Sequence, residues 1–487
     1  FFLIYIMVTL ISIPGAAVLM TLLAGAIFGF VKGTLLVSFA STLGASLAFL
    51  MARYLFRIFV KNKFEKTMTA LNSGLKKDGS FYLFTLRLIP IFPFFLINLV
   101  MGLTNISLKK FYWISQIGML AGTMAYINAG LQLSKLNSLK GILSLDILFS
   151  FAVLGIIPLL SKILLRKIKE KKVYKPFKKN KPKKFDYDMV IIGGGAAGLV
   201  TSYIGSTIKA KTAIVEKHKM GGDCLNTGCI PSKALIRSAH FVYEAKQSKK
   251  LGIKKTEVEF EFSEIMDRVQ EVIKKIEPHD SIERYRKLGV DCINSHGKIT
   301  SPWTIEVEGK TLTTRNITIA CGSSPFIPPL PGLSEVPHST SDTIWNLRKL
   351  PKNMVVLGGG AVGCELAQCF SRFGSNVTLI QKVDRLIPYE DRDVSEFIRK
   401  RFETEGMQVL TGYKAFSVSK EGKSYQINCK TKEEEKKSIT FDHLFLAVGR
   451  KPQVKGYGVE KLGINLRPNK TIEVNEYLQT NYPNIFA

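Results

Sequence analysis

Two cysteines, Cys224 and Cys229, carry the clearest chemistry in this chain. They lie five positions apart in the segment Gly221–Lys233, with glycines before them and Pro231 after them. A pair of thiols stores two electrons as a disulfide, but it needs a partner that takes hydride from a nicotinamide and passes electrons to sulfur. A flavin has that chemistry. The pair therefore predicts a flavin site before it in the chain and a nicotinamide site after it.

The same spacing would also suit two buried structural cysteines or one half of a metal site. A zinc site would need a second pair of cysteines or histidines, and the sequence around the two cysteines lacks such a pair, since His240 stands alone after them. Thiols become reactive when their pKa falls, for example at a helix start or beside a cation. Ser232 and Lys233 begin a predicted helix, which places both thiols around its N-terminal end.

A glycine-rich turn precedes the cysteines. The apolar stretch 188–192 predicts a strand that runs directly into this turn, and the next strand, 212–215, ends in an acid. The glycines permit a tight bend and close approach of a pyrophosphate, the helix start offers amide donors, and the acid can accept from ribose hydroxyls. This order predicts a bound dinucleotide, and the adjacent cysteines favour FAD. The candidate contacts are Gly193, Gly195, Gly198, Glu216, Lys217 and Gly222.

A second turn of the same kind follows the strand 354–357, and its candidate contacts are Gly358, Gly360, Gly363 and Gln381. An acid at the end of the next strand would bind the ribose of NAD, whereas basic residues suit the phosphate of NADP. Here Gln381 stands in place of the acid, with Lys382 and Arg385 after it. This turn therefore predicts a NAD(P)H site, and the residues after its second strand favour NADPH.

The segment GGDCLNTGCIPSK after a GxGxxG turn closely resembles the flavoprotein pyridine nucleotide-disulfide oxidoreductases, the group that contains dihydrolipoamide dehydrogenase, glutathione reductase and mercuric reductase. The match runs from about Tyr187 to Ala487. The resemblance implies that Cys224 meets the substrate and that Cys229 contacts the flavin. It places Lys233 near the reactive edge of the flavin, and Glu365 matches a helix glutamate that pairs with this lysine. An exposed acid favoured by the helix dipole is the alternative for Glu365.

The resemblance also covers segments outside the two turns. Residues 295–297 are similar to the part beside the FAD adenine, 319–323 to the turn that closes the first FAD portion, and 441–452 to the strand that closes the nicotinamide domain. Cys321 replaces the usual threonine, and we interpret it as a packing residue rather than a third redox thiol. The contacts that this adds are Gly297, Ala320, Gly322 and Gly449.

The first third of the chain is apolar and cysteine-free. No charged residue occurs from Phe1 to Val31, and further apolar runs span 33–52, 81–104, 111–133 and 142–165. Runs of about 20 residues match the length needed to cross a bilayer, and several such runs do not fit a cleavable signal peptide. They predict a polytopic membrane domain.

Two of these runs are interrupted, the first by Pro14-Gly15 and the run 81–104 by Arg87, Pro90 and Pro93. Irregular backbone and a buried arginine are tolerated at membrane depth only where protein or water satisfies them, so we predict two re-entrant hairpins. The excess of positive charge in 53–77 and after 165 predicts that both segments are cytoplasmic.

The stretch from Arg87 to Gly102, with Gly44–Arg53 upstream, resembles the DedA/SNARE-associated (VTT) family of membrane proteins over about residues 10–165. That family is associated with lipid translocation, often thought to be proton-coupled. This chain has no Asp or Glu within the two predicted hairpins, which puts coupling through an intramembrane carboxylate in doubt. A membrane anchor for the enzyme and a lipid or solute transporter both fit this domain.

Charge and cysteine usage indicate which surface the basic stretch contacts and in which redox compartment the chain lies. The net charge is +29, and the stretch from Lys162 to Lys184 holds twelve Lys or Arg residues and one acid, Glu170. A nucleic-acid arm is the alternative, but no aromatic stacking pattern accompanies the charge, so we predict a tether at an anionic membrane surface. The odd number of cysteines, seven, argues against a secreted disulfide scaffold and fits a reducing compartment.

We therefore predict an N-terminal all-α polytopic membrane domain with re-entrant hairpins, followed by an α/β part with two Rossmann-like domains. The predicted boundaries are 1–165 for the membrane domain, 166–186 for the basic linker, 187–335 for the FAD-binding domain, 336–452 for the NAD(P)-binding domain and 453–487 for the return to the FAD-binding domain. The chain starts without Met and stops inside a predicted strand, so we expect a piece of a longer protein whose dimerisation domain lies beyond Ala487.

The predicted function is a membrane-tethered, homodimeric oxidoreductase with its flavoprotein domain in the cytoplasm. It would pass electrons from NAD(P)H through FAD to the pair Cys224 and Cys229, and on to a disulfide or a soft metal such as Hg(II). No resident metal and no nucleic-acid partner are predicted. The alternatives are a transporter whose flavoprotein half is a redox regulator, and a quinone-reducing dehydrogenase that would not need the dithiol.

Overall fold

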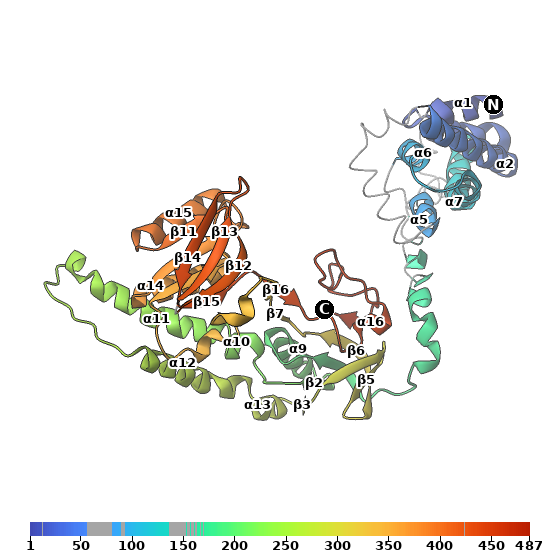
Figure 1. Cartoon of the computed structure of the whole chain (residues 1–487). Coiled ribbons are helices and arrows are strands. Elements are labelled where there is room, and N and C mark those ends of the chain that lie inside the picture. The colour runs from blue at the N-terminus through green and yellow to red at the C-terminus, as the bar shows by residue number, and fades with distance from the viewer. Residues whose placement is uncertain are drawn as a thin grey trace. The chain divides into compact units, whose positions relative to one another are not determined.

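The chain forms two compact units, Phe1–Lys172 and Val173–Ala487 (Figure 1). The structure is a computed structural model, and it describes residues 1–11, 13–55, 80–88, 93–135, 152, 156, 160, 163–165, 167–168, 170–422 and 424–487. The predicted basic loop 53–77 beyond Leu55, Pro90 and most of the predicted span 142–165 lie outside the described residues.

The first unit is helical. Its described helices are α1 (Phe2–Ile11), α2 (Ala16–Tyr54), α5 (Ser80–Leu88), α6 (Phe94–Gly102) and α7 (Leu108–Ser134). Among them, α2 is the one helix with the length and apolar character needed to cross a membrane. The chain turns between α1 and α2 at Gly15 (φ +80°), where the sequence has Pro14-Gly15, and α2 itself is interrupted at Gly29 (φ +72°).

Helices α2 and α7 pack backbone against backbone. A Cβ on Gly25 would lie 2.1 Å from the carbonyl oxygen of Ile127, and a Cβ on Gly130 would lie 2.0 Å from that of Leu22. Glycines at such crossings let helices approach closely, which is the usual means of helix association in membranes. The small residues of this unit therefore set its packing.

The second unit begins with the end of the basic linker. The short helix η2 (Lys175–Asn180) is held by two aromatic residues beside it and within it. Tyr174 stacks on Trp303 with ring centroids 5.0 Å apart, and its hydroxyl donates to Asn484 Oδ1 at 2.6 Å. Phe177 meets the edge of Tyr482. The end of the linker is therefore docked on the second unit, because its aromatic rings find apolar partners there.

The first lobe of this unit is built on a sheet with strand order β3-β2-β1-β6-β5-β4, to which β17 is added beside β6. The pairings among β3, β2, β1 and β6 are parallel, and β6-β5-β4 are antiparallel. Its strands and first helix are β1 (Tyr187–Ile192), α9 (Ala196–Thr207), β2 (Thr212–Glu216), β3 (Val290–Asn294), β4 (Gly297–Ser301), β5 (Thr304–Val307), β6 (Lys310–Ile319) and β17 (Ile485–Phe486).

A helical stretch connects β2 with β3. It comprises α10 (Gly222–Asn226), α11 (Cys229–Lys246), η3 (Ser248–Leu251), α12 (Phe262–Ile276), η4 (Glu277–Asp280) and α13 (Ile282–Lys287). Apolar residues of α11 and α12 share one buried cluster with the second lobe. The cysteines therefore lie on a helical stretch of the first lobe that packs against the second lobe.

The second lobe repeats the parallel plan with strand order β11-β10-β9-β15-β8, and every pairing in it is parallel. Its elements are β8 (His338–Thr340), η6 (Ile344–Asn346), β9 (Asn353–Leu357), α14 (Ala361–Phe373), β10 (Asn376–Gln381), α15 (Arg392–Thr404), β11 (Gln408–Thr411) and β15 (His443–Leu446). Strand β9 is buried over Met354–Leu357, as expected for a central parallel strand covered on both faces.

Smaller elements complete the unit. An antiparallel sheet is formed by β12 (Lys414–Glu421), β13 (Ser424–Lys430) and β14 (Lys436–Phe441). A two-stranded ribbon of β7 (Ser323–Pro325) and β16 (Arg450–Pro452) lies between the two lobes (Figure 1). The remaining short helices are η5 (Leu333–Glu335) and α16 (Val459–Leu462).

A buried ion pair links α14 to the end of α15. The side chain of Glu405 is 3% exposed and accepts hydrogen bonds from Arg372 Nε at 2.9 Å and Arg401 Nε at 2.6 Å. Burial alone would raise the pKa of Glu405, but the hydrogen bonds and positive charge of Arg372 and Arg401 outweigh it and hold that pKa below its ordinary value.

We expect Glu405→Gln to lower the free energy of unfolding by about 3 to 5 kcal/mol at pH 7, because it leaves Arg372 buried without its partner. A carboxylate whose folded-state pKa is depressed stabilises the fold above its unfolded pKa, and this contribution is lost as pH falls through the folded pKa. Denaturant titrations should therefore show that the difference in free energy of unfolding between wild type and variant becomes smaller below about pH 4.3, the ordinary pKa of Glu. A difference that does not change with pH would contradict this.

Candidate active site

Cys224 and Cys229 are positioned by two consecutive helices. Cys224 lies within α10, and Cys229 is the first residue of α11, after Gly228. Both are free thiols, Cys229 is exposed, and the pair is within hydrogen-bonding reach. The hydrogen bond with Cys229 is the main cause that raises the pKa of Cys224 to about 11, burial and the charges of Cys229 and Asp280 add to it, and Lys233 opposes it.

The residues Gly221–Cys229, here called the cysteine loop, are fastened to the first glycine turn. The amide of Gly221 donates to the carbonyl of Gly194 at 2.9 Å. A Cβ on Gly222 would lie 2.6 Å from the Cα of Gly195. The structure thus brings the segment that carries the predicted dithiol into direct contact with the first predicted dinucleotide turn.

The two glycine turns have the same backbone geometry. Gly193 has φ +109° and Gly358 has φ +110°, a region that favours glycine. A Cβ on Gly198 would lie 1.9 Å from the carbonyl oxygen of Gly193, and one on Gly363 would lie 1.9 Å from that of Gly358. Each helix therefore starts in contact with the turn before it, which requires glycine at both positions.

The side chains at the ends of β2 and β10 also take equivalent places. Glu216 Oε2 accepts from the amide of Gly194 at 2.6 Å, and Gln381 Oε1 accepts from the amide of Gly359 at 3.2 Å. Each contact spans 22 residues. The first turn therefore carries a carboxylate where the second carries a neutral amide.

The middle glycine of each turn is open. A Cβ on Gly195 would meet only the Cα of Gly222 at 3.8 Å, and one on Gly360 would meet nothing within 4 Å. Each turn thus leaves room for a pyrophosphate to approach the backbone and the helix start, as a bound dinucleotide requires. The residues present fit the cofactors that the sequence predicts.

The sequence identified Ala320 but missed its counterpart in the second lobe. A Cβ on Gly193 would lie 2.3 Å from the carbonyl oxygen of Ala320, and one on Gly358 would lie 2.3 Å from that of Ala447. The available signal was the spacing, because Ala447 comes two residues before Gly449 as Ala320 comes two residues before Gly322.

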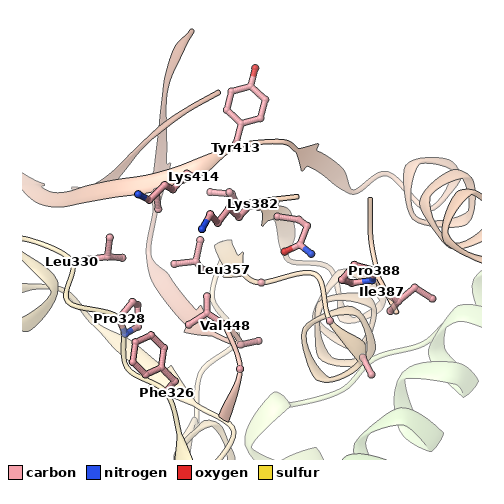
Figure 2. Close-up of a pocket in the computed structure, with 18 of the residues that line it drawn as sticks. Phe326, Pro328, Leu330, Leu357, Lys382, Ile387, Pro388, Tyr413, Lys414 and Val448 are labelled. Atoms are coloured by element: carbon pink, nitrogen blue, oxygen red, sulfur yellow. The ribbon is translucent and has the colours of Figure 1, made fainter. Parts of the chain in front are cut away.

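A cavity of about 820 Å³ opens at the carboxyl ends of β9, β10 and β15. Its size is in the range of ligand sites, and this edge of a parallel sheet is where ligands bind. Figure 2 shows Phe326, Pro328, Leu330 and Val448 on its wall, with Lys382 and Lys414 on another side. The predicted residues Gly358, Gly360, Gln381 and Gly449 line it, and Lys414 and Tyr413 were not predicted.

Several other predicted residues make no described contact that assigns them a role. Lys233 and Glu365 lie on the packed helices α11 and α14, both exposed, and they form no ion pair in the part of the chain that the structure describes. Gly297 opens β4 against Val215, and Lys217 follows β2. Arg385 donates to the carbonyl of Pro388 at 2.5 Å.

The first unit holds a separate buried polar cluster. Arg87 donates from Nη2 to Asn98 Oδ1 at 2.7 Å and from Nε to Ser115 Oγ at 3.1 Å. Arg87 is 9% exposed and Asn98 is 0% exposed, yet Arg87 Nη1 and Asn98 Nδ2 have no hydrogen-bond partner among the residues that the structure describes. Gly118 makes room for the arginine, since a Cβ there would lie 2.7 Å from Arg87 Cβ.

Comparison with known proteins agrees with this geometry. Residues 187–487 match the family model of the pyridine nucleotide-disulphide oxidoreductases, and residues 13–132 match that of the VTT domain. The chain is 35% identical over 307 residues to the dihydrolipoyl dehydrogenase of Acholeplasma laidlawii, covering 62% of this chain and 89% of that protein. It is 30% identical over 302 residues to the mercuric reductase of Staphylococcus aureus, covering 62% of this chain and 55% of that protein.

Among solved structures, the chain is similar to the Cu(II) complex of the HOCl-induced flavoprotein disulfide reductase RclA from Escherichia coli. The TM-score is 0.53 at 25% sequence identity, with coverage of 61% of this chain and 64% of that chain. The α/β part therefore has the flavoprotein oxidoreductase fold, and both resemblances read from the sequence are confirmed. The chain belongs to the pyridine nucleotide-disulphide oxidoreductase family, fused at its N-terminal side to a VTT domain.

Proposed function

We propose that this chain is a membrane-tethered oxidoreductase that passes electrons from NAD(P)H through FAD to Cys224 and Cys229, and on to a disulfide or a soft metal ion. The observation that carries the proposal is the direct contact between the cysteine loop and the first glycine turn, through Gly221 with Gly194 and Gly222 with Gly195. Family membership supports an enzyme that uses FAD and NAD(P)H; the acceptor is our proposal.

Bound FAD would accept a hydride from the nicotinamide and supply two electrons to sulfur. The chain's own residues then handle protons and sulfur. Lys233 lies close enough to Cys224 to favour its thiolate, and only a thiolate attacks an acceptor disulfide. We assign the acceptor-facing role to Cys224 and the inner role to Cys229, with Lys233 and Glu365 as their supports.

The proposed cofactor sites follow the two repeated turns. FAD would be held by residues of the domain 187–335 and of the return segment 453–487, and the nicotinamide dinucleotide by residues of 336–452. The FAD contacts are Gly193, Gly195, Gly198, Glu216, Lys217, Gly222, Lys233, Gly297, Ala320 and Gly322, and the NAD(P)H contacts are Gly358, Gly360, Gly363, Gln381 and Gly449, to which we add Ala447.

We propose NADPH as the preferred donor, because Gln381 removes the negative charge that would repel a ribose phosphate and because Lys382 and Lys414 both line the cavity (Figure 2). Changing both lysines to Gln should raise KM for NADPH by roughly tenfold, the scale of losing hydrogen bonds to a charged group. KM for NADH should stay within about twofold, since NADH lacks that phosphate.

Lys420→Gln is the matched control, because Lys420 is an exposed lysine of β12 that does not line the cavity. Steady-state kinetics with both nucleotides would check the prediction. An equal rise of KM for NADH and NADPH in the double variant would argue against a phosphate site.

The VTT domain and the apolar helix α2 indicate membrane association. We propose a multi-pass arrangement with re-entrant hairpins at the two interrupted segments, the flavoprotein unit in the cytoplasm, and a homodimer. The basic residues of 166–186 would be a linker at the membrane surface.

The central test is an anaerobic NADPH titration of the purified, FAD-loaded full chain. The wild type should take up one hydride equivalent more per flavin than the Cys224→Ser/Cys229→Ser double variant, because the disulfide stores an extra electron pair. Alkylation should then find both thiols free only after reduction. Equal uptake by the two proteins would refute electron storage at this pair.

A transporter of phosphate-bearing lipids is a second candidate for the first unit. The observation that favours it is the buried Arg87, whose Nη1 lies near Asn98 and has, like Asn98 Nδ2, no partner within the described part of the chain. A buried cation that has no carboxylate partner among those residues calls for an anion. Full chain in liposomes should then move a fluorescent phospholipid between leaflets without NAD(P)H, and Arg87→Gln should stop this while Lys110→Gln should not. No lipid movement by the wild type would leave this unit as an anchor.

A further inference from the structure

The cysteine loop is held from outside at two points. The guanidinium of Arg450, on the ribbon strand β16, donates from Nη2 to the carboxylate of Asp223, the neighbour of Cys224. The indole Nε1 of Trp345, in η6 of the second lobe, donates to the carbonyl of Thr227 at 2.9 Å. These two contacts bracket Cys224 and lie on the stretch that leads to Cys229.

Arg450 is itself firmly placed. It donates from Nε to Ser323 Oγ at 2.7 Å, from Nη2 to the carbonyl of Ser323 at 2.7 Å and from Nη1 to Ser341 Oγ at 3.2 Å. It directly follows Gly449, which has φ +114° and lines the cavity. Arg450, which binds the carboxylate of Asp223, is therefore adjacent in sequence to Gly449, a residue that lines the proposed dinucleotide site.

Trp345 is also fixed. Its side chain is buried at 6% exposure, and its single N–H is shared between the carbonyl of Thr227 and that of Ser341, whose oxygen lies 2.8 Å from Nε1. A buried ring with its N–H satisfied has little freedom, so it holds the carbonyl of Thr227 in one place. Gly228 after it has ψ −104°, outside the helical range, where the chain turns from α10 into α11.

A disulfide forms only in a narrow geometry, with Cα atoms usually 4.4–6.8 Å apart. Holding two reacting groups in that geometry raises their effective concentration. On the basis of the proposed function, we propose that Arg450 and Trp345 are positioning residues that hold the cysteine loop in the conformation from which Cys224 and Cys229 close to a disulfide. Neither residue touches sulfur in this role.

A purely electrostatic effect of Arg450 would look different. Losing Arg450 would leave Asp223 negative beside Cys224, disfavour the thiolate and make the dithiol easier to oxidise. Losing the carboxylate of Asp223 would do the opposite, because a stabilised thiolate makes the reduced form harder to oxidise. Positioning predicts instead that both changes make the disulfide less favourable, and that the double change is no worse than either alone.

The test is an equilibrium of the full chain with glutathione, without NAD(P)H. The protein dithiol and glutathione disulfide give the protein disulfide and two glutathione thiols, so the two electrons and two protons leaving Cys224 and Cys229 pass to glutathione. The fraction of the Cys224–Cys229 disulfide is read by alkylation and peptide mass spectrometry across glutathione ratios. The variants are Arg450→Gln, Asp223→Asn, their double, and Trp345→Phe, which keeps the ring and removes the N–H.

The equilibrium constant for disulfide formation should fall about threefold to tenfold in each variant, the scale of one lost hydrogen bond to a carbonyl or a charge. Arg450→Lys should recover part of the loss. Arg399→Gln is the matched control. It removes the ion pair between Arg399 and Glu403 within α15, whose side chains are about as exposed as those of Arg450 and Asp223. FAD content and melting temperature, measured alongside, identify a variant that has simply failed to fold.

The outcomes separate the two proposals. If the wild type forms no Cys224–Cys229 disulfide at any glutathione ratio, the proposed function fails. If it does, but the variants match Arg399→Gln, positioning by Arg450 and Trp345 is wrong and the proposed function stands. Opposite shifts in Arg450→Gln and Asp223→Asn would replace positioning by a charge effect.

Discussion

Replacing Cys224 by serine is expected to lower electron delivery to a disulfide acceptor by roughly a thousandfold or more, the scale on which losing an attacking nucleophile lowers turnover. A serine hydroxyl cannot form the mixed disulfide through which exchange proceeds. The glycine turns and the cavity do not involve Cys224, so reduction of bound FAD by NADPH should be retained. Stopped-flow absorbance for the flavin and steady-state turnover with a disulfide and with Hg(II) separate the two steps.

Cys321→Thr is the matched control, because Cys321 is another partly buried thiol of the first lobe, and its sulfur contacts the carbonyl of Ile192 at 3.6 Å and the side chain of Tyr457 rather than the cysteine pair. It should keep turnover within about twofold, as expected for a near-isosteric change away from the reacting sulfur. Unchanged turnover of Cys224→Ser with both acceptors would exclude the dithiol route. Quinone reduction that survives the loss of both cysteines would favour a quinone-reducing dehydrogenase.

The parts of the site that the sequence could predict are those written as short spacings. The glycines at 193, 195 and 198, their counterparts at 358, 360 and 363, and the cysteine pair each follow from a few neighbouring residues whose backbone needs are strict. The break before α2 was marked in the same way by Pro14-Gly15. Such signals are local, so no fold has to be known before they can be used.

The parts that the sequence could not predict are contacts between distant residues. Arg450 and Asp223 are 227 positions apart, and Trp345 and Thr227 are 118 apart. No periodicity joins such pairs; only the folded sheets bring the ribbon and η6 to the cysteine loop. The linker shows a second cause, because its lysines dominated the composition while Tyr174 and Phe177 decided where it docks.

The second large effect should come from alanine at the two glycines where a helix meets its turn. In Gly363→Ala the new Cβ would lie 1.9 Å from the carbonyl oxygen of Gly358 and 3.2 Å from the Cβ of Ala447. Because the nearest atom belongs to the backbone, relief requires moving α14 away from β9. We expect a loss of about 3 kcal/mol of stability, the upper range for overpacking, and a rise of KM for NADPH by more than tenfold at unchanged FAD content.

The effect should stay within one lobe. Gly198→Ala has the same clash with Gly193 in the first lobe, so it should release FAD while the second lobe still binds NADPH, as measured by flavin absorbance and by calorimetry. Equal loss of both cofactors in either variant would show that the two sites do not depend on separate turns.

Alanine at the open glycines distinguishes a damaged fold from a blocked site. Gly360→Ala meets no protein atom within 4 Å, so the melting temperature should be unchanged, while the methyl group faces the space that the pyrophosphate needs. Gly195→Ala should act likewise on FAD, since its nearest neighbour is at 3.8 Å. If Gly363→Ala leaves both stability and KM unchanged while Gly360→Ala also has no effect, then the second turn does not bind the dinucleotide, and the cavity beside it must be explained in another way.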